Sequence, residues 1–262
     1  MRIQNNITAQ NSHRQYNVNA GQIGKNVEKL SSGYRVNRAA DDAAGLAISE
    51  KMRTQIRGLN MASRNSQDGI SLAQTAEGAM QIAHNIMQRM RELAVQSANG
   101  TNQSLDRQAL DLEFSQLNLE LTQIESTVKF NDMTIFGREF HLQTGANEGN
   151  ITIFSVGRLA LADGTIATSG SASSAITTVT NAINTLSIVR AALGAVQNRL
   201  EFKIQNLDNS AENLAAAESR IRDADMAKMM TEFTKNNILF QASTAMLAQA
   251  NALPQGVLQL LG

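Results

Sequence analysis

Residues 45–98 read GLAISEKMRTQIRGLNMASRNSQDGISLAQTAEGAMQIAHNIMQRMRELAVQSA, and their apolar side chains recur every three or four positions. The positions of this series are Ile48, Met52, Ile56, Leu59, Ala62, Ile70, Ala73, Ala76, Met80, Ala83, Met87, Met90 and Ala94. This spacing is typical of one face of an α-helix, which at about 1.5 Å per residue would be roughly 80 Å long. Helices of globular proteins usually end within about 20 residues, so this helix is predicted to lie along partner helices.

Two more segments have the same helical spacing. Turn-forming residues at 100–104 separate the first helix from a second, predicted at about 105–128. A third series, at 176–214, has the most regular spacing of the three. A short turn followed by a returning helix indicates an antiparallel pair. We therefore expect a mainly α fold, in which the helices at about 45–98, 105–128 and 176–214 form one long antiparallel bundle or coiled coil.

Residues 139–156 interrupt the helical pattern with two alternating runs. Phe140 and Leu142 alternate with polar residues, and ITIFSV at 151–156 follows the turn-forming segment TGANEGN at 144–150. This arrangement predicts one β-hairpin at about 139–156. The next segment, 157–175, ends in the small and polar run GTIATSGSASSA, so we expect a short surface loop there.

Both ends of the chain carry apolar residues at helical positions, although chain ends are usually polar and frayed. The candidate assembly residues are Ile3, Ile7, Val18, Ile23 and Val27 near the N-terminus and Met230, Phe233, Phe240, Leu247, Leu258 and Leu261 near the C-terminus. The N-terminal segment alone cannot bury enough surface to fold. We expect the two ends to pair with each other and with other copies, and to be disordered until assembly. Pro254 is expected to end the last long helix.

The composition excludes several classes of protein. Lys and Arg number 23, as do Asp and Glu, so the net charge is zero and no basic surface for nucleic acid is expected. The chain has no Cys, which excludes disulfide scaffolds, thiolate zinc sites and thiol nucleophiles. No uninterrupted apolar run approaches 18 residues, so no transmembrane helix is expected. The N-terminal residues lack the apolar segment of a cleavable secretory signal.

Few residues suggest catalytic or metal chemistry. Asp41 and Asp42 are adjacent, but a role as caps of the helix that follows is favoured over an acid–base or metal pair. His13, His84 and His141 are far apart and lack the spacing of a zinc-binding helix, so we expect ordinary structural positions. No catalytic constellation, metal site or cofactor is therefore predicted, and an enzyme is the least favoured class.

Three longer motifs resemble those of a known family. Residues 29–61 read KLSSGYRVNRAADDAAGLAISEKMRTQIRGLNM, residues 143–153 read QTGANEGNITI, and residues 211–262 read AENLAAAESRIRDADMAKMMTEFTKNNILFQASTAMLAQANALPQGVLQLLG. Together they resemble bacterial flagellin, the subunit of the flagellar filament, over about residues 1–156 and 176–262.

The resemblance implies a self-assembling extracellular tube. In this family the paired terminal helices form a coiled-coil inner layer, and the bundle with its hairpin forms an outer layer. By this resemblance, residues 1–40 and 221–262 are the two parts of an inner domain, 1–40 including the connecting spoke, and 41–220 is an outer rod domain. The short segment 157–175 replaces the variable outer domains of longer members, so the chain resembles a minimal flagellin.

The resemblance also implies the export route and the partners. Flagellins leave the cell unfolded through the flagellar type III apparatus, which agrees with the absence of Cys and of a cleavable signal. The expected partners are other copies of the chain, an export chaperone at the C-terminal segment, the filament cap and the hook-associated proteins. Neither nucleic-acid binding nor membrane insertion is expected.

The segment 88–99, QRMRELAVQSAN, resembles the part of flagellin that the vertebrate receptor Toll-like receptor 5 recognises. The family pattern places the receptor-binding role on Arg89, Leu93 and Glu113, with Gln88 and Gln96 beside them. Arg89 and Leu93 are four residues apart, so they are expected to share one helix face as an exposed pair. This face could alternatively pack against neighbouring subunits, and both roles are compatible.

Two other functions remain open for the chain. A hook–filament junction protein has terminal features in common with flagellin. A signalling coiled coil, such as the cytoplasmic hairpin of a chemoreceptor, is also rich in Ala, Gln and Asn with heptad spacing. Such a protein normally has a membrane anchor and no β-hairpin between its helices, so the hairpin at 139–156 favours flagellin.

Overall fold

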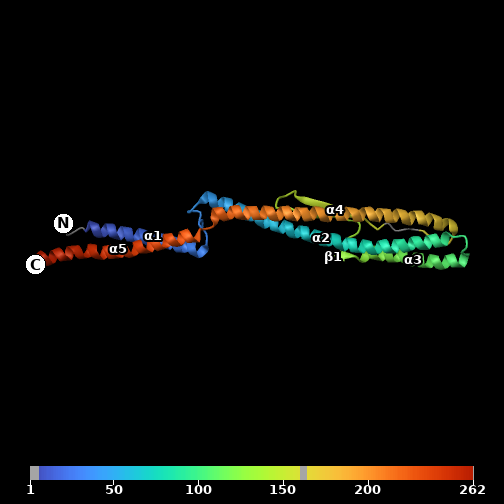
Figure 1. Ribbon diagram of the computed structural model, residues 1–262, viewed down its shortest axis with the longest axis horizontal. Helices are drawn as coiled ribbons and strands as arrows, with labels where there is room; N and C mark the ends of the chain where they lie inside the picture. Colours follow the sequence, from blue (N-terminus) through green and yellow to red (C-terminus); the bar gives the residue numbers. More distant parts are fainter. Residues whose placement is uncertain (1–5, 160–163, 262) are drawn as a thin grey trace. The chain divides into compact units, whose positions relative to one another are not determined.

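The computed structural model describes residues 6–159 and 164–261, with side chains up to residue 252 at the C-terminal end (Figure 1). The helices are α1 (Ile7–Ser32), α2 (Ala43–Ala98), α3 (Ser104–Thr127), α4 (Ser169–Arg222) and α5 (Met226–Leu261). The strands are β1 (Lys129–Phe130), β2 (Met133–Thr134), β3 (Arg138–Gln143) and β4 (Ile151–Val156). The mainly α fold with long helices, paired terminal helices and a hairpin is confirmed.

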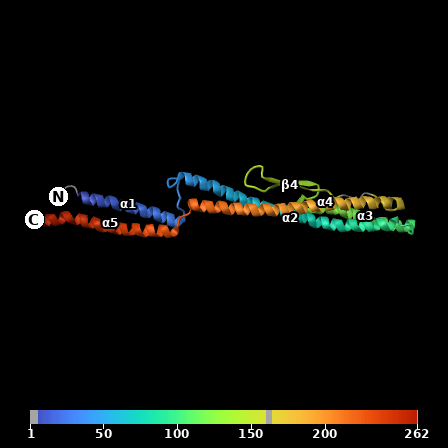
Figure 2. The same cartoon turned by 45° about the horizontal axis from the view of Figure 1, so that its top comes forward.

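The chain separates into two compact units. Unit 1 comprises residues 1–54 and 213–262, and unit 2 comprises residues 55–212. Unit 1 contains the terminal helices α1 and α5, which run side by side in two views (Figures 1 and 2). Unit 2 contains α3, both hairpins and most of α2 and α4. The division into an inner domain and an outer rod with limits at 40 and 220 stays a prediction.

The start of α2 is fixed by the two adjacent aspartates. Asp42 Oδ1 accepts a hydrogen bond from the backbone N–H of Gly45 at 2.8 Å, which is the capping role expected from the sequence. Asp41 instead closes the preceding turn, because its Oδ2 accepts from the backbone N–H groups of Arg38 at 3.1 Å and Asn37 at 3.2 Å. These hydrogen bonds stabilise the carboxylate, so they hold the pKa of Asp41 below its ordinary value.

The core of unit 2 lies between α2, α3 and α4. A row of α4 side chains is buried at every seventh position, and its members are Ala172, Val179, Leu186, Leu193, Leu200 and Leu207. The first four members of this row belong to one continuous cluster with Met80, Met87 and Met90 of α2 and Phe114 and Leu121 of α3. The seven-residue period keeps this row facing the partner helices along α4, as in a coiled coil.

The predicted hairpin, β3 with β4, is antiparallel and pairs Phe140 with Phe154. The two rings lie on the buried face with centroids 5.6 Å apart, while Ile151 and Ile153 of β4 face outward. Gly58 of α2 allows the hairpin to lie close, because a Cβ there would be 2.8 Å from the Cβ of Ala146. The hairpin therefore contributes its aromatic face to the core of unit 2.

A second, shorter hairpin was missed by the sequence analysis. Strands β1 and β2 pair Phe130 with Met133 around Asn131 and Asp132, which have φ angles of 49° and 59°. Positive φ at both central residues is typical of a type I′ turn, which Asn and Asp tolerate better than most residues. Two-residue strands are too short to produce a recognisable alternation, so only the Asn-Asp pair could have indicated this turn.

The prediction of a surface loop up to residue 175 is wrong. Helix α4 already begins at Ser169, where Thr168 and Ser171 exchange hydrogen bonds between their hydroxyl and backbone N–H groups. Ile166 is fully buried, and its backbone N–H donates a hydrogen bond to Asp111 Oδ1 of α3, with 2.6 Å between N and O. The small residues of this segment therefore form the first turns of α4, and their size allows Ala172 and Ala175 to be buried there.

Helix α4 is also long and apolar enough, by length and composition alone, to cross a membrane. The expectation from the sequence rested on a different criterion, an uninterrupted apolar run of 18 residues, and α4 contains no such run. A core helix of a water-exposed bundle meets the same criterion, and the buried heptad row of α4 accounts for part of its apolar character. Only 22% of the apolar window is buried within the chain, so much of its apolar surface faces outward.

Candidate assembly and recognition surfaces

Helices α1 and α5 of unit 1 pair through a seam with a strict heptad spacing on each helix. On α1 the seam residues are Ala9, Ser12, Tyr16, Asn19, Ile23, Asn26 and Leu30, and on α5 they are Met229, Phe233, Asn236, Phe240, Ser243, Leu247 and Ala250. The rings of Tyr16 and Phe240 lie 4.8 Å apart across this seam. Among helix pairs in the described chain, only α1 and α5 bring runs of Cα atoms within 8 Å of each other. Small and amide side chains allow this close approach.

The seam contains buried polar layers that the sequence analysis did not anticipate. Asn19 of α1 is buried, and its Nδ2 donates to Ser243 Oγ at 2.8 Å and to the carbonyl oxygen of Leu239 at 3.3 Å. Asn26, seven residues later, is also buried, and its Nδ2 has no hydrogen-bond partner within the described chain. A buried Asn in a coiled-coil seam lowers stability but favours the one register that satisfies its amide.

Pro254 does not end the last helix, contrary to the expectation from the sequence. Helix α5 continues through Pro254 to Leu261. Proline has no backbone N–H, so the carbonyl of Ala250, four residues earlier, loses its donor within the helix. Asn6 Nδ2 donates to that carbonyl at 2.7 Å, while Asn6 Oδ1 accepts from the backbone N–H of Ala9 and caps α1. One side chain therefore satisfies free backbone groups of both helices.

The candidate assembly residues fall into two groups. Ile23, Phe233, Phe240 and Leu247 are half-buried in the seam between α1 and α5. Ile7, Val18, Val27 and Met230 lie outside the seam and remain about half exposed, so the pairing of α1 with α5 leaves them uncovered. Ile3 lies outside the described residues, as do the side chains of Leu258 and Leu261.

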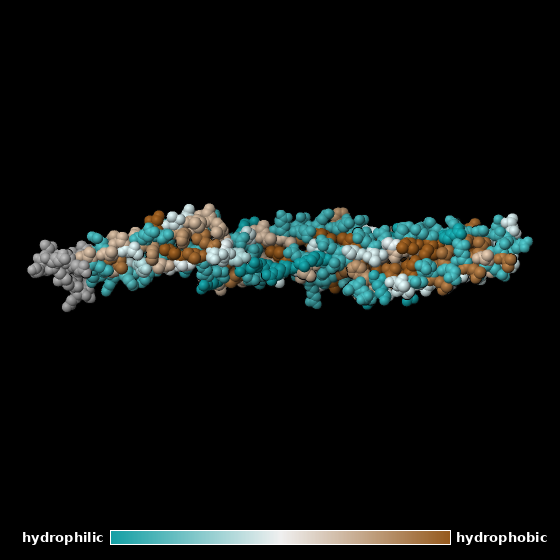
Figure 3. Space-filling view, turned by 90° about the horizontal axis from the view of Figure 1, so that it is seen from below, coloured by the Kyte–Doolittle hydropathy of each residue, from teal (hydrophilic) through white to brown (hydrophobic). Residues whose placement is uncertain are grey.

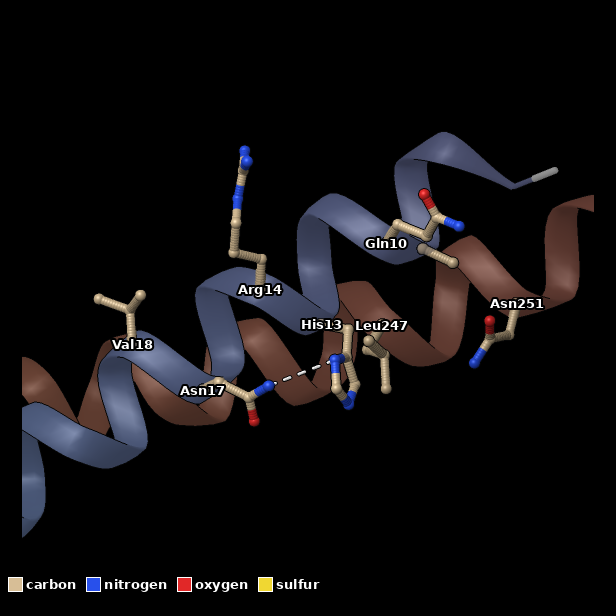
Figure 4. Close-up of a pocket in the computed structure, with 8 residues that line it drawn as sticks. Gln10, His13, Arg14, Asn17, Val18, Leu247 and Asn251 are labelled. Atoms are coloured by element: carbon tan, nitrogen blue, oxygen red, sulfur yellow. Dashed lines mark hydrogen bonds between the residues drawn. The ribbon is translucent and has the colours of Figure 1, made fainter.

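A shallow hollow of about 700 Å³ lies between α1 and α5. Figure 4 shows Leu247 of α5 beside His13, whose Nδ1 lies 3.3 Å from Asn17 Nδ2, while Arg14 and Val18 point away from α5. Amide groups, His13, Arg14 and three apolar side chains line the hollow, and no carboxylate is among the lining residues. This arrangement suits contact with another protein surface better than catalysis.

Tyr34 lies at the centre of a charged cluster in unit 1 that the sequence analysis did not single out. The guanidinium carbons of Arg222 and Arg53 lie 4.7 and 5.8 Å from the centre of the Tyr34 ring. Arg222 pairs with Glu50 at 2.5 Å, and Arg53 pairs with Glu218 at 3.5 Å. Cation–π contacts and ion pairs thus connect the segment before α2 with the end of α4. The signal was present in the SGYRVNR part of the first motif.

The predicted receptor-binding residues begin with an exposed ion pair. Arg89 Nε of α2 donates to Glu113 Oε1 of α3 at 2.9 Å, and Arg89 Nη1 lies 3.2 Å from Glu92. The hydrogen bond that Arg89 donates to Glu113 is the largest cause that raises the pKa of Arg89 above its ordinary value. Both partners are about half exposed, so the pair contributes little to folding stability but presents a fixed polar pattern at the surface.

Leu93 does not form the exposed pair with Arg89 that the helical spacing suggested. Its side chain is 0% exposed and belongs to the core of unit 2. A spacing of four residues places Arg89 and Leu93 on neighbouring parts of the helix surface, but Leu93 faces the core and Arg89 faces solvent. Leu93 can therefore support the surface from beneath, and the exposed pair consists of Arg89 and Glu113.

Gln88 and Gln96 lie on a different surface of α2. Both are exposed and line an open groove of about 660 Å³, together with Thr180 and Ile183 of α4. Arg91 crosses this groove, and its Nε donates to Thr180 Oγ1 at 3.2 Å. The structure thus separates the five predicted receptor-binding residues into an ion pair toward α3, a groove toward α4 and one core side chain.

The three histidines do not come together. His13 is exposed on α1, His141 is exposed on β3, and His84 on α2 lies 2.9 Å from Gln88, measured between the two Nε2 atoms. No group of His, Asp and Glu side chains suited to hold a metal ion occurs among the residues that the structure describes.

Comparison with known families shows what this architecture is. The model of the bacterial flagellin N-terminal helical region matches residues 3–140, and that of the bacterial flagellin C-terminal helical region matches residues 176–261. The chain belongs to the bacterial flagellin family. These matches include α1, α2, α3, α5, most of α4, and strands β1 and β2. They leave residues 141–175 outside, with β4 and the first turns of α4.

Individual relatives support the same conclusion over the full length. The chain is 55% identical to flagellin of Halalkalibacterium halodurans and 50% identical to flagellin of Bacillus subtilis, with all of each chain covered. The crystal structure of Bacillus cereus flagellin is 31% identical, with a TM-score of 0.52, and it covers 59% of this chain and 94% of that chain. The short chain is consistent with a minimal flagellin.

This flagellin is therefore a structural subunit of a flagellar filament and not an enzyme. The family self-polymerises, which agrees with the apolar side chains that α1 and α5 leave uncovered. The hook–filament junction protein and the signalling coiled coil are less well supported, because relatives named flagellin align along the entire chain.

Proposed function

We propose that this flagellin polymerises through its paired terminal helices into an extracellular filament used for swimming. The observation that carries the proposal is the set of apolar side chains left exposed on the outer faces of α1 and α5, among them Val18, Val27 and Met230. Half-exposed apolar side chains on a paired helix remain available for burial against other copies. Seam residues such as Phe240 would then position the pair, and the outer residues would join neighbours.

Replacing Val18, Val27 and Met230 with Gln tests this assignment. If assembly buries their exposed halves, each substitution removes about 1 kcal/mol, and the triple variant should need roughly a hundredfold higher concentration to polymerise. The critical concentration is measured by sedimentation of filaments after seeding. Circular dichroism of the monomer should be unchanged, because the three side chains lie outside the seam.

The matched control keeps all three positions apolar. A chain with Val18→Ile, Val27→Ile and Met230→Leu should assemble at about the normal concentration. Normal assembly of the Gln variant would show that the outer faces of α1 and α5 are not assembly surfaces.

The proposal includes export and the other partners of the filament. The chain would pass unfolded through the flagellar type III apparatus and the channel of the growing filament, with an export chaperone on its C-terminal segment. The filament cap and the hook-associated proteins would contact its two ends. The absence of Cys supports this route, because no disulfide can block a chain that must remain unfolded.

A second proposed role is recognition by Toll-like receptor 5 through the ion pair of Arg89 and Glu113. The specific support is that this pair is exposed, joins two helices and is held in a fixed geometry by the hydrogen bonds that Arg89 donates to Glu113 and Glu92. Arginines with a fixed orientation are common among the residues that dominate binding energy. Gln88 and Gln96 would contribute from the adjacent groove, and Leu93 would hold α2 in place from the core.

The receptor role predicts a selective loss in the variant Arg89→Ala. Receptor activation in reporter cells should need at least about tenfold more protein, because the side chain lost is a central polar contact. Arg64→Ala, another exposed position on α2 in unit 2, is the control and should behave as the parent chain. Equal activity of Arg89→Ala and the parent would contradict the role.

A further inference from the structure

Helix α3 carries an exposed row of leucines on the side that faces away from the core of unit 2. Leu105, Leu112 and Leu119 are seven residues apart, and their residues are 76%, 68% and 61% exposed. The apolar positions of α3 that pack in the core, such as Phe114 and Leu121, belong to a different face. Three large apolar side chains in line on a solvent-facing helix have no structural role within the chain, and such a row is typical of a contact surface.

This leucine row is accompanied by a row of acidic residues. Each leucine is followed directly by a carboxylate, and the three pairs are Leu105-Asp106, Leu112-Glu113 and Leu119-Glu120. All three acidic residues are exposed, and the same seven-residue spacing carries them along one edge of the row. Any protein that packs on the leucines is therefore favoured if it presents an apolar row with basic residues beside it.

Helix α4 presents a second exposed row that has these properties. Ile188 and Phe202 are both 70% exposed and fourteen residues apart, and exposed Ala195 lies midway between them. Arg199 and Lys203 lie one helical turn or less from Phe202 along the same helix. This aliphatic and aromatic row is separate from the heptad row of α4 that packs in the core, which includes Leu186 and Leu193.

We propose that the leucine row of α3 packs against the Ile188–Phe202 row of α4 in a second copy of this chain. Both rows extend over fourteen residues, about 21 Å of helix, and both have their middle member seven residues from each end. Asp106 and Glu120 beside one row are complementary in charge to Arg199 and Lys203 beside the other, where Glu201 is the one carboxylate next to Phe202. The small side chain of Ala195 leaves room for Leu112 at the centre of the contact.

The two rows are exposed within the same unit, so they do not cover each other in a single chain. A contact between different surfaces of identical chains can repeat from copy to copy, and such heterologous contacts build a helical polymer. The proposal therefore rests on the proposed function and adds a surface of unit 2 to the terminal helices as an assembly contact. Figure 3 shows hydrophobic side chains gathered on the seen face toward the part of unit 2 that contains α3.

Disulfide cross-linking provides a direct test because the chain has no Cys of its own. One chain carries Leu112→Cys and another carries Ala195→Cys, and equal amounts are polymerised together and then oxidised. Leu112 and Ala195 are the centres of their rows, so they meet whether the two helices run parallel or antiparallel. The expected result is a covalent dimer of the two different chains in filaments and none in the unpolymerised mixture.

A matched control places the thiol on the same helix but away from the leucine row. Thr122→Cys replaces an exposed α3 residue that points about 80° around the helix from Leu112, and with Ala195→Cys it should give little dimer. Filaments that form normally but give no Leu112–Ala195 dimer would overturn this contact and leave the proposed function intact. Failure of the unsubstituted chain to polymerise would instead overturn the proposed function.

A second measurement keeps the test independent of thiol chemistry. The variant Leu112→Gln should raise the critical concentration for polymerisation about tenfold, and Leu112→Met, which keeps an apolar side chain, should leave it nearly unchanged. Both monomers should retain the parent's helix content, since Leu112 is exposed there. Equal assembly of the two variants would contradict the proposed contact.

Discussion

A chain that lacks residues 1–32 is expected to form no filaments, while its unit 2 stays folded. The deletion removes α1 and with it one side of the seam of unit 1. Phe233, Phe240 and Leu247 of α5 would then be exposed along one face, without the partner helix that orders them. An isolated helix loses most of its stability when its packing partner is removed, so α5 should lose both its structure and its outer assembly face.

Electron microscopy after seeding with fragments of full-length filaments measures this result. The truncated chain should give no elongation, and the full-length chain should give normal filaments under the same conditions. Thermal unfolding followed by circular dichroism is the control for folding, and it should retain the transition of unit 2, whose core contains no residue of α1. Normal elongation of the truncated chain would contradict the assignment of assembly to the paired ends.

The substitution Phe114→Ala should destabilise unit 2 by about 3–5 kcal/mol. Phe114 is 1% exposed and is the largest of the fully buried side chains in the described part of the chain. Its ring belongs to the same buried cluster as Met87 and Met90 of α2. Replacement by Ala removes the apolar contacts and leaves a cavity that the long, packed helices can close only in part.

Urea unfolding of the monomer followed by circular dichroism measures this change as a lower midpoint for unit 2. The matched control is Leu112→Ala, two residues away on the same helix, which should change the free energy of unfolding by less than about 0.5 kcal/mol. Equal effects of the two substitutions would show that α3 faces the core differently from the arrangement described here. The pair also separates folding from assembly, because Leu112 is expected to matter only in the polymer.

The helices were predictable because their apolar spacing continues over many turns. The limits of α2 and α3 differ from the predicted limits by no more than two residues, and the Phe140 and Phe154 alternation located the longer hairpin. Periodicity could not locate the start of α4, since Ser169 and Gly170 resemble loop residues. There the cap formed by Thr168 and Ser171 and the burial of Ile166 outweigh local composition.

The candidate surfaces were predictable only in part, because helical spacing does not show where a neighbouring helix lies. Leu93 follows Arg89 by one turn, yet Leu93 is buried in the core of unit 2 and Arg89 is exposed. Likewise, the spacing of apolar residues at the termini identifies Phe233 and Phe240 as seam residues. It does not identify Asn19, whose role in the seam depends on its burial and its hydrogen bond to Ser243. Pro254 was expected to end α5, because the sequence does not show that Asn6, at the other end of the chain, donates to the carbonyl oxygen that proline leaves without a donor.

The amide contacts of Asn6 and Asn19 also have a mechanical consequence for the pair of terminal helices. They join α1 to α5 at two heights thirteen residues apart, about 20 Å along α1. An apolar seam resists separation but offers little resistance to sliding, since each heptad presents a similar surface to the next. For α1 to slip by one heptad under axial load, both contacts must break together and Asn19 would be buried without its partner. The amide hydrogen bonds would therefore resist sliding of α1 along α5 under axial load, while the apolar seam residues would resist separation of the two helices.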